Sequence, residues 1–363
     1  MISGETPEVV YRLPDSTIIM RIRQSSSSLI TLNDYAEIAS HTGFIVAPFR
    51  TSTECPIVII SPDKTEELNE NDIETDVARL PKIVVNDADV SSNKARYESD
   101  FCRFHRQLTD NRFEKIVLAR SEDMLFETPL TSNDELRQTA HKLFLKACKL
   151  YPHQFISLII IPKIGIWLMA TPEVLLSIEG NNGRSMALAG TMPFDSSCQA
   201  AEDIVWSEKN ITEQHIVAEY IKRQLSDIAP QLTIDKARTV VSANVCHIRT
   251  DIHFGIDNNT DIGKIISKLH PTPAVCGLPK SDTYDFISNN ETLKRQYYSG
   301  FAGTLLSKHD VNLFVSLRCM QIMNDRYRLY AGGGLLKEST KEREWNETCA
   351  KMQAMKMLIE NEE

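Results

Sequence analysis

Short runs of apolar and β-branched residues, separated by turn-forming residues, mark the first 60 positions of the chain. These runs lie at residues 9–11, 17–20, 44–46 and 57–60. Three further apolar runs, at 155–161, 165–170 and 174–178, follow one another with no room for a helix between them. Runs of this kind predict strands, and their close succession predicts antiparallel pairing rather than parallel βαβ units.

Apolar residues at helical spacing occur in longer segments. The stretch 200–229 lacks Gly and Pro and stops before Pro230, which predicts one long helix. Ser132 is a candidate cap for a helix at 134–150, and a last helix is predicted at 340–360. The remaining predicted helices lie at 92–109, 259–268 and 282–290, and the remaining strands at 115–119, 233–242, 297–305, 311–321 and 327–332.

The mixture of many strands with separate groups of helices predicts an α+β fold. Residues 63–79 hold seven acidic side chains and are predicted to form a solvated connection, which places a boundary near residue 90. We therefore expect a short β-rich N-terminal portion, residues 1–90, packed into the same fold as a main domain of residues 91–363.

The charge balance restricts the class of ligand. The chain has 40 Lys and Arg against 49 Asp and Glu, a formal net charge of -9. Non-specific binding of nucleic acid or of an anionic membrane needs a cationic face, so we expect neither partner. The longest apolar run, residues 155–162, is too short to span a bilayer.

Cysteine use and the N-terminus indicate a compartment. The eight cysteines form no CxxC pair and no zinc-site spacing, which is typical of reduced thiols. The N-terminus has no apolar segment of the kind found in secretory signals. We expect a cytoplasmic protein, and the absence of a heptad repeat leads us to expect a monomer.

The predicted last helix carries two carboxylates and an amine on one face. Glu344, Glu347 and Lys351 are three and four residues apart, so their side chains project from the same side. The plain interpretation is a solvated face with an ordinary Glu–Lys pair. The preceding triple Gly332–Gly334, in a chain with only 14 glycines, suggests a second one, in which bare backbone N–H groups bind an anion.

Five other charged or titratable residues are candidate functional residues. Lys115 opens an apolar strand, where it lies at an edge or, if desolvated, acts as a general base. Arg318 lies in an apolar strand and is expected to be buried with an anionic partner. By default Glu173 is a turn carboxylate and Glu213 an exposed helix carboxylate, while His270 is either a structural hydrogen-bonding residue or a site residue.

Eight sequence segments, in order along residues 93–358, form a more specific signal together than any of them alone. They are Lys115–Arg120 (KIVLAR), Ala170–Glu173 (ATPE), Leu188–Thr191 (LAGT), Ser207–Lys209 (SEK) with Glu213, Leu269–Val275 (LHPTPAV), Arg295–Gly300 (RQYYSG), Leu317–Arg318 (LR), and Ala331–Gly334 (AGGG) followed by Glu344–Lys351 (EWNETCAK). This pattern resembles the chorismate-utilising enzymes, the family that contains isochorismate synthase, salicylate synthase, anthranilate synthase component I and aminodeoxychorismate synthase. The resemblance implies that family's fold, an antiparallel β-sandwich core flanked by helices, with residues 91–363 as the chorismate-binding catalytic domain.

Within the family, two positions bear on the reaction that the resemblance implies. Members that add water are similar to this chain in having lysine at position 115, whereas ammonia-using members have glutamine there, so no glutaminase subunit is expected. Aminodeoxychorismate synthases place a nucleophilic lysine where this chain has Ala189. The runs 269–275 and 344–347 look most like those of isochorismate synthases, isomerases that add water at C2 of chorismate with loss of the C4 hydroxyl. Salicylate synthases share Lys115 and Glu173 and then eliminate pyruvate, and they are the alternative.

The resemblance also implies roles for individual residues. Lys115 would act as the general base on water, and Glu173 as the general acid toward the leaving hydroxyl. Mg²⁺, a hard cation that takes few carboxylates, would be held by Glu213, Glu344 and Glu347. The residues implied to bind chorismate are Thr191, His270, Tyr298, Arg318, Gly332, Gly334 and Lys351.

The chain departs from the family pattern at two positions. Gln214 stands where the family has histidine after glutamate, and Cys276 stands where glycine usually follows Pro-Ala-Val. A non-catalytic chorismate- or metal-binding regulator would be expected to lack at least one of the implied acid, base or metal-binding residues, and all of them are present. The resemblance extends to enzymes of menaquinone and of siderophore synthesis, and leaves the pathway open.

Overall fold

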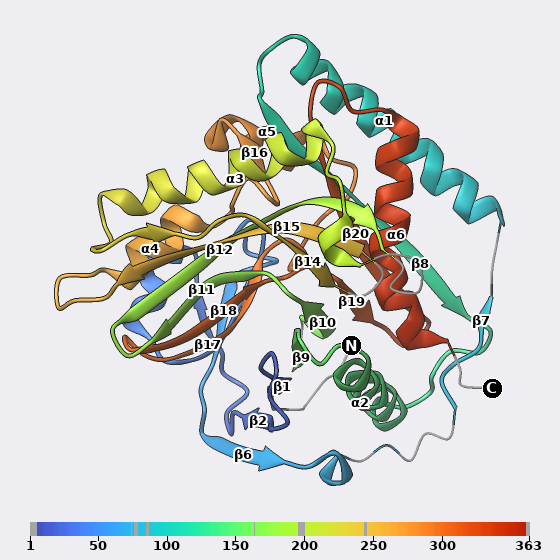
Figure 1. Cartoon of the computed structure of the whole chain (residues 1–363). Helices are drawn as coiled ribbons and strands as arrows, with labels where there is room; N and C mark the ends of the chain where they lie inside the picture. The colour runs from blue at the N-terminus through green and yellow to red at the C-terminus, as the bar shows by residue number, and fades with distance from the viewer. Residues whose placement is uncertain are drawn as a thin grey trace.

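The computed structural model describes residues 6–73, 75, 79–84, 87–162, 164–194, 200–242 and 245–360, and its strands form two ten-stranded antiparallel sheets (Figure 1). In sheet A the order is β16 (Gly277–Leu278), β8 (Lys115–Phe126), β20 (Arg326–Leu335), β19 (Cys319–Ile322), β10 (Gly165–Thr171), β9 (Phe155–Ile161), β1 (Glu8–Arg12), β2 (Ile19–Arg23) and β6 (Lys64–Leu68), and β7 (Ile83–Val84) pairs with β8. In sheet B the order is β13 (Thr233–Ile234), β15 (Val245–Gly255), β12 (Asn182–Pro193), β11 (Val174–Glu179), β18 (Asp310–Val315), β17 (Phe301–Ser307), β4 (Gly43–Ala47), β5 (Ile57–Ile60) and β3 (Ile30–Leu32), and β14 (Arg238–Ser242) pairs with β15.

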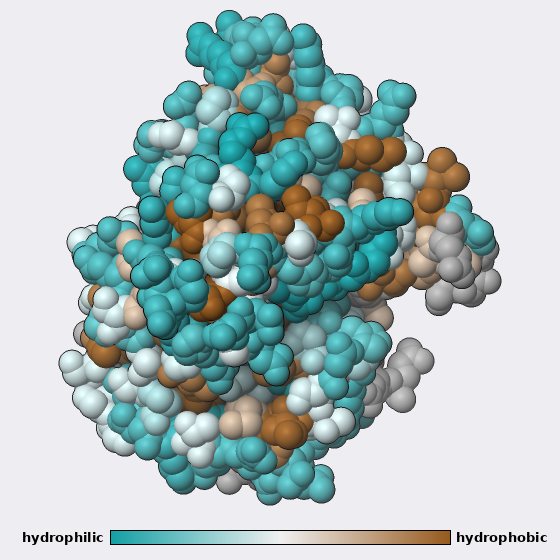
Figure 2. Space-filling model, turned by 60° about the vertical axis from the view of Figure 1, so that its left-hand side comes forward, coloured by the Kyte–Doolittle hydropathy of each residue, from teal (hydrophilic) through white to brown (hydrophobic). Residues whose placement is uncertain are grey.

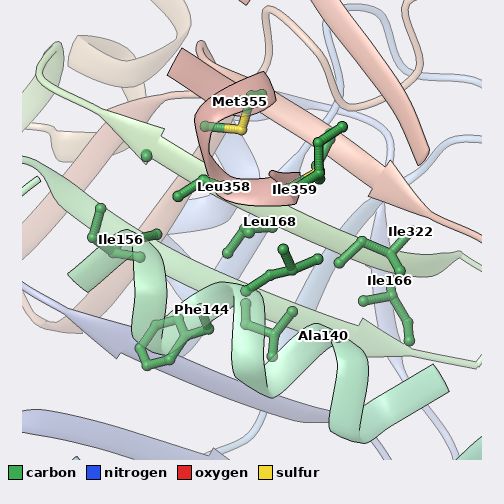
Figure 3. Close-up of a cluster of buried hydrophobic side chains, with 14 of the residues drawn as sticks. Ala140, Phe144, Ile156, Ile166, Leu168, Ile322, Met355, Leu358 and Ile359 are labelled. Atoms are coloured by element: carbon green, nitrogen blue, oxygen red, sulfur yellow. The ribbon is translucent and has the colours of Figure 1, made fainter. Parts of the chain in front are cut away.

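Helices cover the outer faces of both sheets. The α-helices are α1 (Asp87–Thr109), α2 (Asn133–Leu150), α3 (Glu208–Ser226), α4 (Ile262–Leu269), α5 (Lys280–Asn290) and α6 (Lys341–Ile359), and the 3-10 helices are η1 (Tyr35–Ser40), η2 (Glu70–Asp72) and η3 (Ala201–Asp203). α2 and α6 pack on sheet A, where Phe144 and Met355 meet Ile156 and Leu168 (Figure 3). α3 and α4 pack on sheet B, and α1 and α5 pack on β8.

A third apolar layer joins the two sheets face to face. Trp167 is fully buried there, and the rings of Phe155 and Phe314 stack with their centroids 4.2 Å apart. The order helix, sheet, sheet, helix confirms the predicted α+β fold with an antiparallel sandwich core.

Local sequence signals place most elements correctly. The side chain of Ser132 accepts a hydrogen bond from the backbone N–H of Glu135, so the predicted cap of α2 is confirmed. The long helix begins later than predicted, because Ser207 caps α3 at Glu208 and residues 201–203 form η3 instead. The prediction contained neither β12 nor β15, the two long strands that form a wall of the site described below.

Two predicted strand groupings are wrong. The run 311–321 forms two strands, β18 in sheet B and β19 in sheet A, and β10 and β11 also belong to different sheets. The acidic segment 63–79 contains β6 and η2 rather than one solvated connection, and residues 74 and 76–78 of it lie outside the described part. Strands from the first 70 residues complete the edges of both sheets.

Two crossovers between the sheets lie side by side. One leads from β10 to β11 through Pro172 and Glu173, and the other leads from β18 to β19 through residues 316–318. The backbone N–H of Val315 donates to the carbonyl of Glu173 at 2.9 Å, and that of Ala170 donates to the carbonyl of Arg318 at 3.0 Å. The predicted general acid and the buried arginine are therefore held next to each other by the backbone.

On the face shown in Figure 2, hydrophilic side chains predominate and the hydrophobic ones form separate small groups. Among the described residues, no helix is long and apolar enough to cross a membrane.

Candidate active site

A small, partly enclosed pocket of about 50 Å³ lies where the two crossovers meet β12, β15 and β20. Eight of the twelve predicted site residues line this inner pocket: Glu173, Thr191, Glu213, Tyr298, Arg318, Gly332, Gly334 and Lys351. Three of the others, Lys115, Glu344 and Glu347, lie just behind its wall or beside it, in ion pairs described below. The structure therefore brings together residues as far apart in the sequence as Lys115 and Lys351, which are separated by 236 positions.

Glu173 is a buried carboxyl beside a buried guanidinium. It is only 2% exposed, and burial raises its pKa to about 8, although the positive charges of Lys115, Arg318 and Lys351 act in the opposite direction. The default interpretation as an ordinary turn carboxylate does not account for this burial. A carboxyl group with this pKa is largely protonated at neutral pH, so it has a proton to donate.

Arg318 lies in the second crossover, not within a strand as predicted. Its backbone adopts a positive φ of 45°, which is uncommon for a side chain other than Gly, Asn or Asp. Its Nη2 donates to Nε2 of His247 at 2.8 Å, and it lines the inner pocket. The predicted burial is confirmed, but the hydrogen-bond partner is a neutral ring rather than an anion.

His247, which is not among the predicted site residues, fixes this arginine. Its Nδ1 lies 2.9 Å from the carbonyl oxygen of Gly190, and its Nε2 accepts from Arg318. Burial, with the nearby charges of Arg318 and Lys351, holds the pKa of the imidazole well below its usual range, so the ring is neutral with the proton on Nδ1. Gly190 has a φ of +71° at a bulge between Ala189 and Thr191. The bulge turns the Gly190 carbonyl toward the ring.

Lys115 is fully buried against the glycine stretch. Its Nζ lies 3.1 Å from Oε1 of Glu213, so it is neither an edge residue nor exposed. Burial alone would raise the pKa of Glu213, but the charges of Lys115 and Lys209 outweigh it and lower that pKa. A Cβ at Gly334 would lie 2.1 Å from Oε1 of Glu213 and 2.8 Å from Cε of Lys115. Gly334 thus leaves room for this ion pair.

The glycine stretch is a regular part of strand β20, paired with β8, and not a loop after a strand. A Cβ at Gly332 would lie 2.9 Å from the hydroxyl of Tyr298, which lines the pocket and is fully buried. Nζ of Lys351 donates to the carbonyl of Gly332 at 2.9 Å. Binding of an anion by N–H groups of this stretch stays a prediction.

Two further ion pairs link α6 to the pocket. Nζ of Lys351 lies 2.6 Å from Oε1 of Glu347, and Nζ of Lys209 lies 2.6 Å from Oε1 of Glu344. Burial and the charge of Glu347 raise the pKa of Glu344, while Lys209 opposes them. Lys209 belongs to the motif Ser207–Lys209, but the sequence predicts no role for it, because its partner Glu344 lies 135 positions away.

The two carboxylates on α6 fit a divalent cation. A Cβ at Gly333 would lie 3.3 Å from Oε2 of Glu344 and 3.6 Å from Oε1 of Glu347, so the two groups converge there. Oε2 of Glu344 is buried and accepts no hydrogen bond within the described part of the chain. Two carboxylates suit Mg²⁺, which keeps several water ligands. A set of three His, Cys, Asp or Glu ligands does not occur among the described residues, and Glu213 pairs with Lys115 instead.

His270 does not belong to the pocket. Its Nε2 faces the carbonyls of Pro48 and Phe49 at 3.2 and 3.3 Å, and its ring packs on Tyr35 and Phe301. The alternative interpretation, a structural hydrogen-bonding residue, is therefore the one that the structure supports.

The two departures from the family pattern are accommodated by hydrogen bonds. Nε2 of Gln214 donates to the hydroxyl of Thr250 at 2.7 Å. Cys276 is buried, with its Sγ 3.6 Å from the hydroxyl of Thr283.

Comparison with known proteins decides which family these residues represent. Residues 45–360 match the family described as "Chorismate binding enzyme". This chain belongs to the chorismate-binding enzymes. Relatives within the family include the isochorismate synthase MenF of Escherichia coli, 29% identical over 71% of this chain and 58% of that protein, and the salicylate biosynthesis isochorismate synthase of Pseudomonas aeruginosa, 29% identical over 68% of this chain and 51% of that protein. The chain thus spans little more than half the length of these relatives.

The fold is also that of solved chorismate-binding enzymes. A putative 2,3-dihydroxybenzoate-specific isochorismate synthase, DhbC, of Bacillus anthracis superposes with a TM-score of 0.79 at 24% identity, covering 97% of this chain and 96% of that one. This likeness shows the shared fold, and the site geometry carries the chemical argument.

Proposed function

We propose that this chorismate-binding enzyme is an isochorismate synthase, which adds water at C2 of chorismate and expels the C4 hydroxyl. The observation that carries the proposal is the pairing of opposite acid–base roles at one pocket. Glu173 is a carboxyl whose pKa is raised to about 8, and Lys115 is a fully buried amine paired with Glu213. The names of the relatives support the same reaction.

Glu173 donates its proton to the leaving C4 hydroxyl, which departs as water. After Lys115 has released its proton to solvent, the neutral amine takes a proton from the water that attacks C2, and the carboxylate of Glu213, 3.1 Å away, stabilises the ammonium that forms again. At the end of the turnover Glu173 has lost a proton and Lys115 has gained one. Exchange of protons with solvent restores both groups.

Substrate charge is held by the cationic side of the pocket. Chorismate carries two carboxylates, and Arg318 is oriented toward one of them by its hydrogen bond to His247. Tyr298 lies on the same wall, and its hydroxyl donates a hydrogen bond to that carboxylate. Lys351 contributes charge from α6.

Mg²⁺ is the cation that we propose for Glu344 and Glu347, which would hold it, and it would supply positive charge to offset the negative charge of the substrate. The convergence of these two carboxylates at Gly333 supports this assignment. The seven described cysteines are free thiols, which suits a reducing compartment, and we propose that the enzyme is cytoplasmic.

Chromatographic analysis of the products tests the proposal. Purified protein, chorismate and Mg²⁺ are incubated without an ammonia source, and an equilibrium mixture of chorismate and isochorismate is expected. Salicylate with pyruvate would instead identify a salicylate synthase, and unchanged chorismate would refute both reactions. The Glu179→Gln variant, at an exposed carboxylate of β11, is the matched control and should retain the wild-type products.

A further inference from the structure

A second and larger cavity of about 550 Å³ adjoins the inner pocket. It lies between the end of β12 and the N-terminal half of α6, and its lining comprises Thr191, Met192, Thr340, Glu342, Arg343, Asn346, Glu347 and Ala350. We call it the outer chamber. Thr191 also lines the inner pocket, and Glu347 on the outer side is bonded to Lys351 on the inner side. The two cavities therefore meet at one threonine and one ion pair.

The size of the two cavities assigns them different tasks. The inner pocket, at about 50 Å³, is much smaller than the outer chamber, at about 550 Å³. The outer chamber has room for a substituted six-membered ring. A ring-sized substrate therefore has a position beside the catalytic groups before it reaches them.

Charges along one face of α6 lead from the outer chamber into the inner pocket. Arg343, Glu347 and Lys351 are spaced by four residues, so their side chains follow one another along the same side of the helix. Glu347 is already neutralised by Lys351 at 2.6 Å. Arg343 is exposed and forms no ion pair within the described part of the chain, which leaves its guanidinium for an incoming anion.

Glu342 also lines the chamber and acts against an anion. In a protein of net charge -9, a dianion approaching this opening is repelled unless a local cation compensates. Arg343 is the cationic side chain in the chamber lining and contributes to this compensation.

We propose that the outer chamber is the access site for the dianionic substrate, where Arg343 pairs with a substrate carboxylate before Lys351 and Arg318 bind it inside. The proposal rests on the proposed function in taking chorismate as the dianion. Arg343 acts on capture and not on the chemical step, because it lies two helical turns from Lys351.

Charge changes at the chamber test this role through the salt dependence of kcat/KM. Arg343→Glu should lower kcat/KM for chorismate roughly fivefold to tenfold at low ionic strength, and the loss should shrink to about twofold or less in 0.5 M salt, since exposed charges are screened. Glu342→Gln should raise kcat/KM about twofold under the same low-salt conditions. The loss in Arg343→Glu should fall on kcat/KM, with kcat changed less than about twofold.

The matched control is Lys264→Glu, which makes the same change in net charge at an exposed lysine of α4, on the other side of the molecule from α6 (Figure 1). It should leave kcat/KM at the wild-type value. The access role is overturned if Arg343→Glu behaves like this control, if its loss does not depend on salt, or if the loss falls on kcat. Failure of the wild type to convert chorismate would refute the proposed function instead, and the same three variants would then be compared by the rate of chorismate association in stopped-flow tryptophan fluorescence, with the same expected order.

Discussion

Glu173 should make the stability of the protein depend on pH in a way that one substitution removes. Burial raises its pKa from the ordinary 4.5 to about 8. Since the folded-state pKa lies above the unfolded one, the folded protein keeps a proton that the unfolded chain releases between these two values. The stability associated with the protonated carboxyl is complete below about pH 4.5 and is lost as the pH rises through about 8.

The expected magnitude follows from this interval. Each pH unit in the window corresponds to about 1.4 kcal/mol, so the whole interval from 4.5 to about 8 amounts to about 5 kcal/mol. Glu173→Gln keeps the size of the side chain and removes its titration. Between pH 5.5 and 7.5 the wild type should therefore lose about 3 kcal/mol of unfolding free energy relative to this variant. Urea unfolding followed by circular dichroism at pH 5.5, 6.5, 7.5 and 8.5 measures the difference.

Glu179→Gln is the control, because it removes an exposed carboxylate from the other end of β11. It measures how the unfolding free energy changes when a carboxylate that is not buried is removed. A difference between wild type and Glu173→Gln that stays constant across this pH range would refute the reasoning, since a buried carboxyl with a raised pKa cannot avoid this dependence. The same titration predicts that kcat/KM falls above about pH 8, where Glu173 has lost the proton that it donates.

Three further predictions concern the neighbouring groups. Lys115→Gln should abolish isochorismate formation while circular dichroism shows a folded protein, because an amide cannot take a proton from water; chromatography showing the wild-type rate would contradict the assignment of the base. Glu347→Gln should weaken Mg²⁺ binding at least about tenfold in isothermal titration calorimetry, as expected for loss of one of two carboxylate ligands, and unchanged affinity would remove Glu347 from the site. Gly334→Ala places a methyl group 2.1 Å from a carboxylate oxygen of Glu213 and should lower the unfolding free energy in urea by about 1–3 kcal/mol. Gly255→Ala, whose added methyl group has its nearest atoms at 3.4 Å, should lower it less. Equal losses would show that the Lys115–Glu213 ion pair shifts freely.

Elements with a local signal were predictable from sequence, and their assignment to a sheet was not. The N-cap at Ser132 and the run of β9 depend on neighbouring residues, and both agree with the structure. The run 311–321 looks like one apolar strand because both of its halves are buried, but the chain changes sheet at residues 316–318, where Arg318 adopts a positive φ. Hydrophobicity records burial, and it does not record which sheet buries the residue.

In the candidate site, too, only contacts between residues close in the sequence could be predicted. The spacing on the last helix correctly brings Glu347 and Lys351 together, since residues four apart share a helix face. The contacts of Lys209 with Glu344 and of His247 with Arg318 join residues 135 and 71 positions apart. No local pattern encodes such pairs, and His247 is only one of several polar residues along β15.

The adjoining crossovers have a mechanical consequence. Glu173 and Arg318 each belong to a segment that passes from one sheet to the other, and two backbone hydrogen bonds tie the segments together. The distance between the proton donor Glu173 and the carboxylate-binding Arg318 thus depends on how the two sheets pack on each other. The stacked rings of Phe155 and Phe314 are part of that packing. A substitution that lets one sheet slide over the other would displace Glu173 relative to Arg318 without changing any residue of the pocket. The rigidity of the sandwich therefore determines how accurately these two side chains are positioned for catalysis.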